Sequence, residues 1–369
     1  MSGIPPLKTI YAYLTSGCNC ACRHCWIVEK GRQGHGRLLD VAALRHAIEQ
    51  ALPLGLKSIK WTGGEPTLHP QFIEFLELQS SYQLSGVVET NGMLISRELA
   101  RVMRDSGVRN ISVSLDGATA EVHDEIRGVA GGFEKTVSGI NALVAAGCHP
   151  ELILTLQRSN LDQLTDFLRL ASQLGAGNVK LNVVQPMLRG SALEEEGETL
   201  SIAELLDLAQ WLRSGQVEQG GMPVNLDLPP AFRPLGAIVS GADSGLCDIL
   251  HILGVIPDGK YALCGIGQHV DALVMGDVIS ASLDDVWSRN PVLCALRDGL
   301  PAQLKGVCAS CLMKGACRGN CIAVNFQGNN DLFAPFWFCQ RAYEQGRFPA
   351  TRLKGGGTRT AWPEQPIRL

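Results

Sequence analysis

Through residues 8 to about 215, short apolar runs alternate with amphipathic stretches, and this alternation predicts the fold. Six runs rich in β-branched or apolar residues have the length of strands, and they cover residues 8–14, 57–61, 86–90, 110–115, 151–156 and 179–185. A stretch with helical spacing follows each run, at residues 40–51, 72–78, 97–103, 136–146, 161–170 and 202–212. Six consecutive strand–helix units imply an α/β fold with a parallel sheet, right-handed crossovers and helices outside it.

The number of units limits the kind of sheet. A closed barrel of this type needs eight strands, so we expect an open, partial (β/α)6 TIM-like barrel or a doubly wound sheet in residues 1–215. In both folds ligands bind at the carboxyl ends of the strands. Functional residues are therefore expected just after each predicted strand.

The rest of the chain differs from this core in composition. Residues 216–246 are rich in Gly and Pro and weakly periodic, so we interpret them as a bridging segment. Residues 247–345 are rich in cysteine with little long-range periodicity, as expected of a small domain held together by metal ligands. Residues 346–369 are mostly polar and predict a flexible C-terminal tail.

Charge and hydrophobicity exclude several functional classes. The chain has 369 residues, 46% apolar and 18% charged, with a net charge of −4, which is typical of a globular protein. It has no run of lysine or arginine that would attract nucleic acid or a membrane surface. No apolar stretch approaches the roughly 20 residues of a membrane span, and the N-terminus does not resemble a signal peptide. We therefore expect a cytoplasmic protein.

Thirteen cysteines are clumped along the chain, four within residues 18–25 and five within residues 308–339. In a reducing cytosol, clumped cysteines more often hold metal than form disulfides. Cys18, Cys22 and Cys25 follow the first strand with the spacing C-x3-C-x2-C. Three thiolates can hold three irons of a 4Fe–4S cluster and leave one iron open to a small molecule. The alternative is a zinc site, which needs a fourth ligand, and Cys20 is the nearby candidate.

This spacing resembles that of the radical S-adenosylmethionine (SAM) enzymes, in which the open iron binds SAM. Residues 63–66 at the end of the second strand read Gly-Gly-Glu-Pro, which is similar to a segment of the same family. The resemblance implies that reductive cleavage of SAM releases a 5′-deoxyadenosyl radical, which abstracts a hydrogen atom. It also implies SAM contacts near the cluster and at the strand ends, from His24, Gly63, Gly64, Glu65, Asn91, Ser114, Asp116, Arg127 and Leu188.

Several of these residues have a physical reason to contact SAM, and each also has an ordinary structural interpretation. Glycines 63 and 64 let backbone carbonyls approach the SAM ammonium closely, and Glu65 can add a charge-assisted contact, although this segment could be an ordinary turn. Arg127 offers a planar fork that suits the SAM carboxylate, although a lone arginine is more often a solvated surface group. The run that ends at Leu188 would either line the adenine or belong to the core.

A second group of cysteines follows with the spacing C-x11-G-x4-C, then C-x2-C-x5-C-x3-C, then one more cysteine. This string resembles the seven-cysteine SPASM domain of radical SAM maturases, whereas a zinc ribbon would explain only its tightest pair. The resemblance implies two auxiliary 4Fe–4S clusters, and so three clusters in all. It assigns three thiols to the nearer auxiliary cluster and four to the farther one: Cys247, Cys264 and Cys321, then Cys308, Cys311, Cys317 and Cys339.

The nearer auxiliary cluster is one protein ligand short. Asp243 or another oxygen ligand completes it, or its fourth iron is open to substrate, and both possibilities stay open. Cys20, Cys148 and Cys294 belong to neither set. Free cysteine is usually a small buried hydrophobe, and we favour that interpretation for Cys148 and Cys294 over a hydrogen-atom donor.

The resemblance covers about residues 8–340 and implies a maturase of ribosomally made precursor peptides. Such enzymes catalyse crosslinking, oxidation, epimerisation, or excision of a tyramine unit that leaves a β-amino acid. Because the first strand begins by Lys8, we expect a discrete peptide-recognition (RRE) protein as partner, and a flavodoxin- or ferredoxin-type reductant. Two alternatives stay open: a radical SAM dehydrogenase or mutase of a small molecule such as a sugar, and a non-enzymatic iron–sulfur electron carrier.

Overall fold

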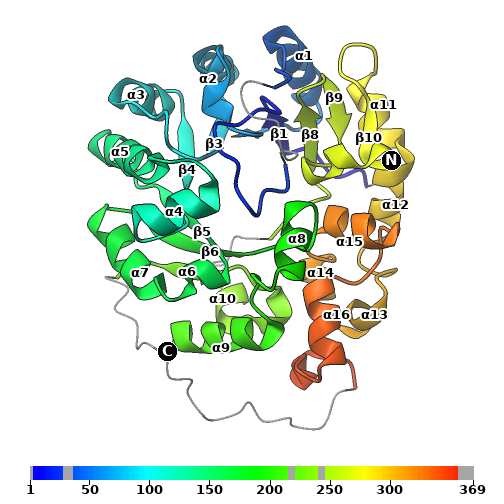
Figure 1. Ribbon diagram of the computed structural model, residues 1–369. Coiled ribbons are helices and arrows are strands. Elements are labelled where there is room, and N and C mark those ends of the chain that lie inside the picture. The colour runs from blue at the N-terminus through cyan, green and yellow to red at the C-terminus, as the bar shows by residue number, and fades with distance from the viewer. Residues whose placement is uncertain (1–2, 28–35, 215–220, 240–245, 356–369) are drawn as a thin grey trace.

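The computed structural model describes residues 3–27, 36–214, 221–239 and 246–355, and it is an open barrel of strands with helices around it (Figure 1). The first six strands are parallel neighbours in chain order. They are β1 Thr9–Tyr13, β2 Ser58–Thr62, β3 Ser85–Thr90, β4 Val108–Ser114, β5 Glu151–Leu156 and β6 Asn178–Val183. The predicted α/β fold with a partial (β/α)6 barrel is confirmed.

A helix covers the outside of the sheet after each of these strands, as the periodicity predicted. These helices are α1 Val41–Ala51, α2 Phe72–Ser81, α3 Arg97–Asp105, α5 Gly132–Ala145, α7 Leu164–Gln173 and α9 Ile202–Arg213. α1 begins after Asp40, whose carboxylate accepts a hydrogen bond from the Ala43 amide, and its predicted apolar face is buried. α5 begins four residues before the predicted start, because the Asp124 carboxylate accepts from the amides of Gly131 and Phe133.

Three short helices that the periodicity did not predict lie between a strand and the helix that follows it. They are α4 Ala120–Arg127, α6 Arg158–Leu161 and α8 Arg189–Glu195. Each follows the carboxyl end of β4, β5 or β6, so all three lie at the ligand-binding end of the barrel. β6 ends at Val183 rather than at residue 185, because the chain turns there toward α8.

The sheet continues beyond the six predicted strands on both sides. In the described part of the chain it has ten strands, in the order β10-β9-β8-β1-β2-β3-β4-β5-β6-β7. β7 Val224–Leu226 extends the β6 edge in parallel. On the other side, β8 Ile252–Ile256 pairs in parallel with β1, and β9 Lys260–Ala262 and β10 Val274–Asp277 follow as antiparallel strands. Part of the cysteine-rich region is therefore continuous with the barrel.

Short helices make up most of the remaining chain. They are α10 Leu235–Val239, α11 Leu283–Arg289, α12 Pro291–Gly299, α13 Gly306–Ser310, α14 Lys314–Cys317, α15 Ile322–Asn329 and α16 Trp337–Glu344. α11 packs against α1, whereas α13 packs against α16, and α16 contacts α9. Two helices of the cysteine-rich region, α11 and α16, thus contact helices of the barrel, α1 and α9.

The two faces of the barrel sheet differ in polarity. On β2, Ile59 and Trp61 are fully buried toward the helices, and burial of such side chains is worth roughly 1.5–3 kcal/mol each. The alternate positions face the lumen of the barrel, and there the chain places Lys60 on β2, Glu89 on β3 and Lys180 on β6. The lumen is therefore polar, unlike the apolar, filled interior of a closed TIM barrel.

Candidate active site

The loop that follows β1 carries the first group of cysteines. Cys18, Cys20 and Cys22 are buried against one another, and Cys25 packs beside them with part of its surface exposed. Backbone hydrogen bonds hold the loop from two directions. The amides of Ala21 and Arg23 donate to carbonyls at the end of α4, and the amides of Gly64 and Glu65 at the end of β2 donate to carbonyls of the loop.

Three thiolates on one loop suit the three protein ligands of a 4Fe–4S cluster that leaves one iron open. The thiols of this loop lie close together, and Cys20 forms side-chain hydrogen bonds with both Cys18 and Cys22. Among the described residues, no three His, Cys, Asp or Glu side chains form the site of a single metal ion. A hydrogen bond from Cys20, together with the positive charge of Arg127, lowers the pKa of the Cys22 thiol to about 5. Cys22 therefore favours the thiolate form that binds iron.

Gly63 and Gly64 are required by backbone packing. Gly63 has a φ of +132°, and a Cβ at Gly64 would lie only 1.8 Å from the carbonyl oxygen of Gly17 in the cluster loop. The Gly64 amide donates to the carbonyl of Thr15 at 2.8 Å. The two glycines thus let the end of β2 lie directly against the loop of cysteines. Their predicted contact with SAM stays a prediction.

Gly64→Ala should displace the cluster loop, because the Gly17 carbonyl that its Cβ would meet is backbone and cannot rotate away. We expect a loss of roughly 1–3 kcal/mol in the free energy of unfolding and loss of iron from the core cluster. Gly328→Ala is the matched control, since a Cβ there meets nothing within 4 Å. Iron analysis and thermal unfolding of the reconstituted protein measure both effects, and normal iron content in Gly64→Ala would contradict this role.

Glu65 is buried and ties the end of β2 to the end of β3. One of its carboxylate oxygens accepts hydrogen bonds from the amide and hydroxyl of Thr67 and from the hydroxyl of Thr90, and the other accepts from the amide of Asn91. Burial raises the pKa of Glu65 above its usual value. Its observed contacts are with the protein, and a charge-assisted contact with SAM stays a prediction.

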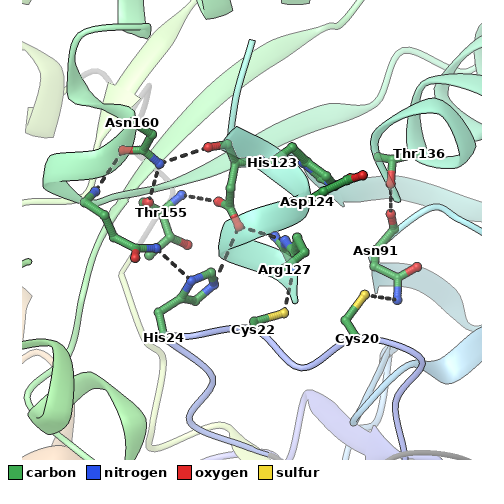
Figure 2. A network of polar contacts seen from close by, with 12 residues as sticks. Cys20, Cys22, His24, Asn91, His123, Asp124, Arg127, Thr136, Thr155 and Asn160 are labelled. Carbon is green, nitrogen blue, oxygen red and sulfur yellow. Dashed lines mark hydrogen bonds and ion pairs between the residues drawn. The ribbon is translucent and has the colours of Figure 1, made fainter. Parts of the chain in front are cut away.

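Asp116, just after β4, is the centre of a buried polar network, and Figure 2 labels its neighbours His24, Arg127, Thr155 and Asn160. Its carboxylate forms an ion pair with Arg127, with 2.7 Å between Oδ2 and Nε, and lies 3.7 Å from Nε2 of His24. Its other oxygen accepts a hydrogen bond from the Thr155 amide at 2.7 Å. Burial alone would raise the pKa of Asp116, but the charges of Arg127 and His24 hold it below its usual value.

Arg127 connects this network to the cysteines. Figure 2 shows its side chain reaching toward Cys22, and its Nη1 lies 3.5 Å from the Cys22 sulfur. His24 is oriented from its other side, because Nε2 of Gln157 donates to its Nδ1 at 3.0 Å. The predicted residues His24, Asp116 and Arg127 are therefore brought together beside the cluster loop.

Sequence reasoning missed three residues that support this network. Gln157 orients His24, Thr155 donates to Asp116, and Asn160 donates from Nδ2 to the Asp116 carbonyl at 3.0 Å. All three follow or end β5, the strand next to β4. Their position after a predicted strand is the one sequence signal that could have indicated them.

Asn91, at the end of β3, contacts the other side of the cluster loop. Its side-chain amide donates to Oδ1 of Asn19 at 2.6 Å and lies 3.5 Å from the Cys20 sulfur, while its carbonyl accepts from Thr136. Cys20 also contacts the sulfur of Met93 at 3.6 Å. Cys20 therefore belongs to the first group in space, although its own contacts are with polar and sulfur groups of β3 and its loop.

The remaining predicted SAM contacts lie at the same end of the barrel. Ser114 is the last residue of β4 and is partly exposed. Leu188 precedes α8 with a φ of +50°, a strained value for a residue other than glycine. The next residue, Arg189, donates to the carbonyl of Cys22 at 2.8 Å. The turn that contains Leu188 is therefore fastened to the cluster loop.

The second group of cysteines forms two separate sets in space. Four of them line one pocket, and these are the four that the resemblance assigned to the farther cluster: Cys308, Cys311, Cys317 and Cys339. The other three influence one another. Burial raises the pKa of Cys247, and the neighbouring thiols of Cys321 and Cys264 raise it further. The structure therefore brings each set of thiols together, and the clusters that they would hold stay a prediction.

The fourth ligand of the nearer set is not placed, because Asp243 lies outside the described residues. Cys148 and Cys294 lie apart from both sets and are partly exposed rather than fully buried. Cys148 packs against the hydrophobic core, and the Cys294 thiol donates to the Ser288 carbonyl at 3.4 Å.

The lumen between the two groups of cysteines carries a chain of alternating charges. Lys60 pairs with Glu89 at 2.5 Å, and Lys180 pairs with Asp227 at 3.3 Å. Burial alone would raise the pKa of Glu89, but Lys60 and Lys180 lower it below its usual value. Tyr11 lies within reach of the Lys60 ammonium, 4.9 Å from the centre of its ring. The lumen therefore offers both charges to a bound substrate.

None of the described helices is long and apolar enough to cross a membrane.

Comparison with known proteins identifies the family. Residues 12–171 match the Radical SAM superfamily. Mycofactocin maturase MftC of Mycobacterium ulcerans is 32% identical over 335 residues, which cover 89% of this chain and 87% of that protein. AdoMet-dependent heme synthase of Methanosarcina barkeri is 28% identical over 346 residues, covering 88% and 94%. Streptococcus suis SuiB, crystallised with its precursor peptide SuiA, has the same fold with a TM-score of 0.70 at 15% identity, covering 91% of this chain and 76% of that one.

The chain belongs to the radical SAM superfamily. It is a radical SAM enzyme of the SPASM-containing maturase type, which binds SAM and an iron–sulfur cluster in its barrel. The resemblance stated from the cysteine spacing is confirmed, and an enzyme is favoured over an electron carrier.

Proposed function

We propose that this enzyme modifies a ribosomally made precursor peptide. One chain contains both a cluster loop and a second cysteine system. The chain is also similar to mycofactocin maturase along 89% of its own length, and this combination supports the proposal. The reaction is one of the four classes expected from the sequence: crosslinking, oxidation, epimerisation, or excision of a tyramine unit. The proposal also places the protein in the cytoplasm, where thiols stay reduced and can hold iron.

The cofactor assignment follows the grouping of the thiols. Cys18, Cys22 and Cys25 would hold the core cluster, next to Arg127 and Asn91. The four thiols that line one pocket would hold the farther auxiliary cluster, and Cys247, Cys264 and Cys321 would hold the nearer one. When bound, the core cluster and SAM supply the radical chemistry, while the protein supplies position, electrostatics and exclusion of water.

The residue of the peptide that reacts would lie in the polar lumen. Lys60 and Lys180 flank the Glu89 carboxylate and lower its pKa, so Glu89 would stay ionised beside a bound substrate. The charge of Lys60 also reaches Cys247, where it offsets part of the rise in the pKa of that thiol that burial causes. The same lysine would therefore contact both the substrate space and the nearer auxiliary set.

Two protein partners complete the proposal. A discrete RRE protein would deliver the leader part of the precursor peptide, and a flavodoxin or ferredoxin would supply the electron. A pull-down with the small recognition protein encoded nearby should detect binding at micromolar concentration. Absence of binding there would count against the RRE partner without affecting the peptide substrate.

A small-molecule substrate is the second candidate function. It is favoured by the similarity to AdoMet-dependent heme synthase, which matches 94% of that enzyme's length. This candidate keeps the core cluster and SAM but replaces the peptide with a compact substrate in the lumen. Cleavage of SAM that does not depend on any peptide would support it.

The deciding experiment is anaerobic reconstitution followed by mass spectrometry. The reconstituted enzyme is incubated with SAM, dithionite and the peptide encoded by the neighbouring small open reading frame. We expect 5′-deoxyadenosine to form faster with the peptide than without it, and the peptide mass to change in every proposed class except epimerisation, which leaves the mass unchanged. Loss of about 2 Da indicates oxidation or a crosslink, and a large loss indicates excision. An unmodified peptide with unchanged 5′-deoxyadenosine would contradict the proposal.

A further inference from the structure

Arg127 occupies a fixed position between a carboxylate and a sulfur. Its Nε lies 2.7 Å from Oδ2 of Asp116, and its Nη1 lies 3.5 Å from the Cys22 sulfur. The side chain of Arg127 is only 8% exposed, so water does not compete for these contacts. Because the guanidinium is planar and rigid, fixing one edge against Asp116 also fixes the direction of the edge that meets Cys22.

Asp116 is itself immobilised by its neighbours. It is fully buried, its Oδ1 accepts from the Thr155 amide, and its backbone carbonyl accepts from Asn160. Its own amide donates to Nδ1 of His123 at 3.1 Å. With the backbone and carboxylate both held, Asp116 is a rigid support for the arginine.

A hydrogen bond to a cluster-binding sulfur stabilises the reduced form of the cluster. The donor withdraws electron density from the sulfur, and hydrogen bonds to the sulfurs are among the features that set the potentials of such clusters. We propose that Asp116 positions Arg127 so that the guanidinium donates to the Cys22 sulfur and makes the core cluster easier to reduce. This role goes beyond the proposed peptide substrate and holds for any substrate.

Asp116 can influence the reduction potential of the core cluster in two ways. As a simple negative charge near the cluster, Asp116 would disfavour reduction, and its removal would raise the reduction potential. As a positioning residue, it keeps Arg127 on the sulfur, and its removal would lower the potential. Asp116→Asn, which preserves the shape of the side chain, therefore gives shifts of opposite sign in the two cases.

The test is a redox titration of the reconstituted full-length protein followed by electron paramagnetic resonance, in the absence of SAM. A separate sample with SAM identifies the core cluster, because its signal is the one that changes. We expect Asp116→Asn and Arg127→Lys to lower the reduction equilibrium constant about tenfold, which is 59 mV for a one-electron couple. Arg158→Gln is the matched control, because Arg158 pairs with Glu204 on the surface and should leave the potential unchanged.

Removing one partner of a buried ion pair can prevent folding, so a double variant accompanies the single ones. Asp116→Asn with Arg127→Gln removes both charges, so the net charge of the pair stays zero and a lower potential reports the lost hydrogen bond alone. An unchanged or higher potential in Asp116→Asn with normal iron content would overturn the proposal. If Asp116→Asn binds no iron, an unchanged potential in Arg127→Lys or in the double variant overturns it equally.

Discussion

Cys22→Ala is expected to reduce SAM cleavage to background, a loss of more than about a thousandfold. Cys22 is buried in the cluster loop and is the cysteine to which Arg127 donates, so alanine removes both an iron ligand and the anchor of the buried network. Without this thiolate only two of the three proposed ligands remain, and the open iron that SAM needs is not formed. The measurement is 5′-deoxyadenosine formed with dithionite in the absence of oxygen.

Cys20→Ala is the matched control for this experiment, since Cys20 lies in the same loop and is buried to a similar extent. Its sulfur contacts Asn91 and Met93, and it stands outside the C-x3-C-x2-C spacing. We expect this variant to keep its iron and most of its SAM cleavage. If Cys20→Ala lost the cluster while Cys22→Ala kept it, the ligand assignment would be wrong. Zinc in place of iron and sulfide would refute the cluster itself.

The local pattern of the sequence was enough to predict the six strands of the barrel, but not the strands that extend the sheet at its edges. The six strand–helix units were predictable because each contains its own hydrophobic period, and some also carry a capping residue, as Asp40 does for α1. The pairing of β8 with β1 joins residues that are more than two hundred positions apart. The run Ile252–Ile256 is short and wholly apolar, and periodicity alone does not distinguish such a run from part of a buried helix.

The sequence likewise predicted some residues of the candidate site and not others. The residues that belong to a spaced motif, such as Cys22 and Arg127, could be named from the sequence. The residues that support them could not be named, because Thr155 and Gln157 are ordinary polar residues in the sequence. Their roles depend on which side chains the fold places beside them, Asp116 for Thr155 and His24 for Gln157. Gly64 was expected to let a backbone carbonyl approach SAM, and the structure adds a second reason for glycine there, because a Cβ would meet the carbonyl of Gly17.

The farther set of cysteines should matter for stability and product formation more than for SAM cleavage. Cys311 lines one pocket with three other thiols, and its backbone pairs with Leu353 in an isolated bridge. Metal binding in such a pocket contributes to folding directly. We therefore expect Cys311→Ala to lower the free energy of unfolding of the reconstituted protein by more than about 4 kcal/mol, in the range that loss of a metal site produces.

The same variant should separate radical generation from turnover, because the pocket that Cys311 lines contains no residue of the core loop. Cys311→Ala should keep a measurable part of its 5′-deoxyadenosine formation while modified product falls at least about tenfold. Cys294→Ala is the control, since its thiol donates to the Ser288 carbonyl and belongs to neither set. Equal loss of 5′-deoxyadenosine and product in Cys311→Ala, with normal folding, would mean that the farther set acts on the core cluster itself.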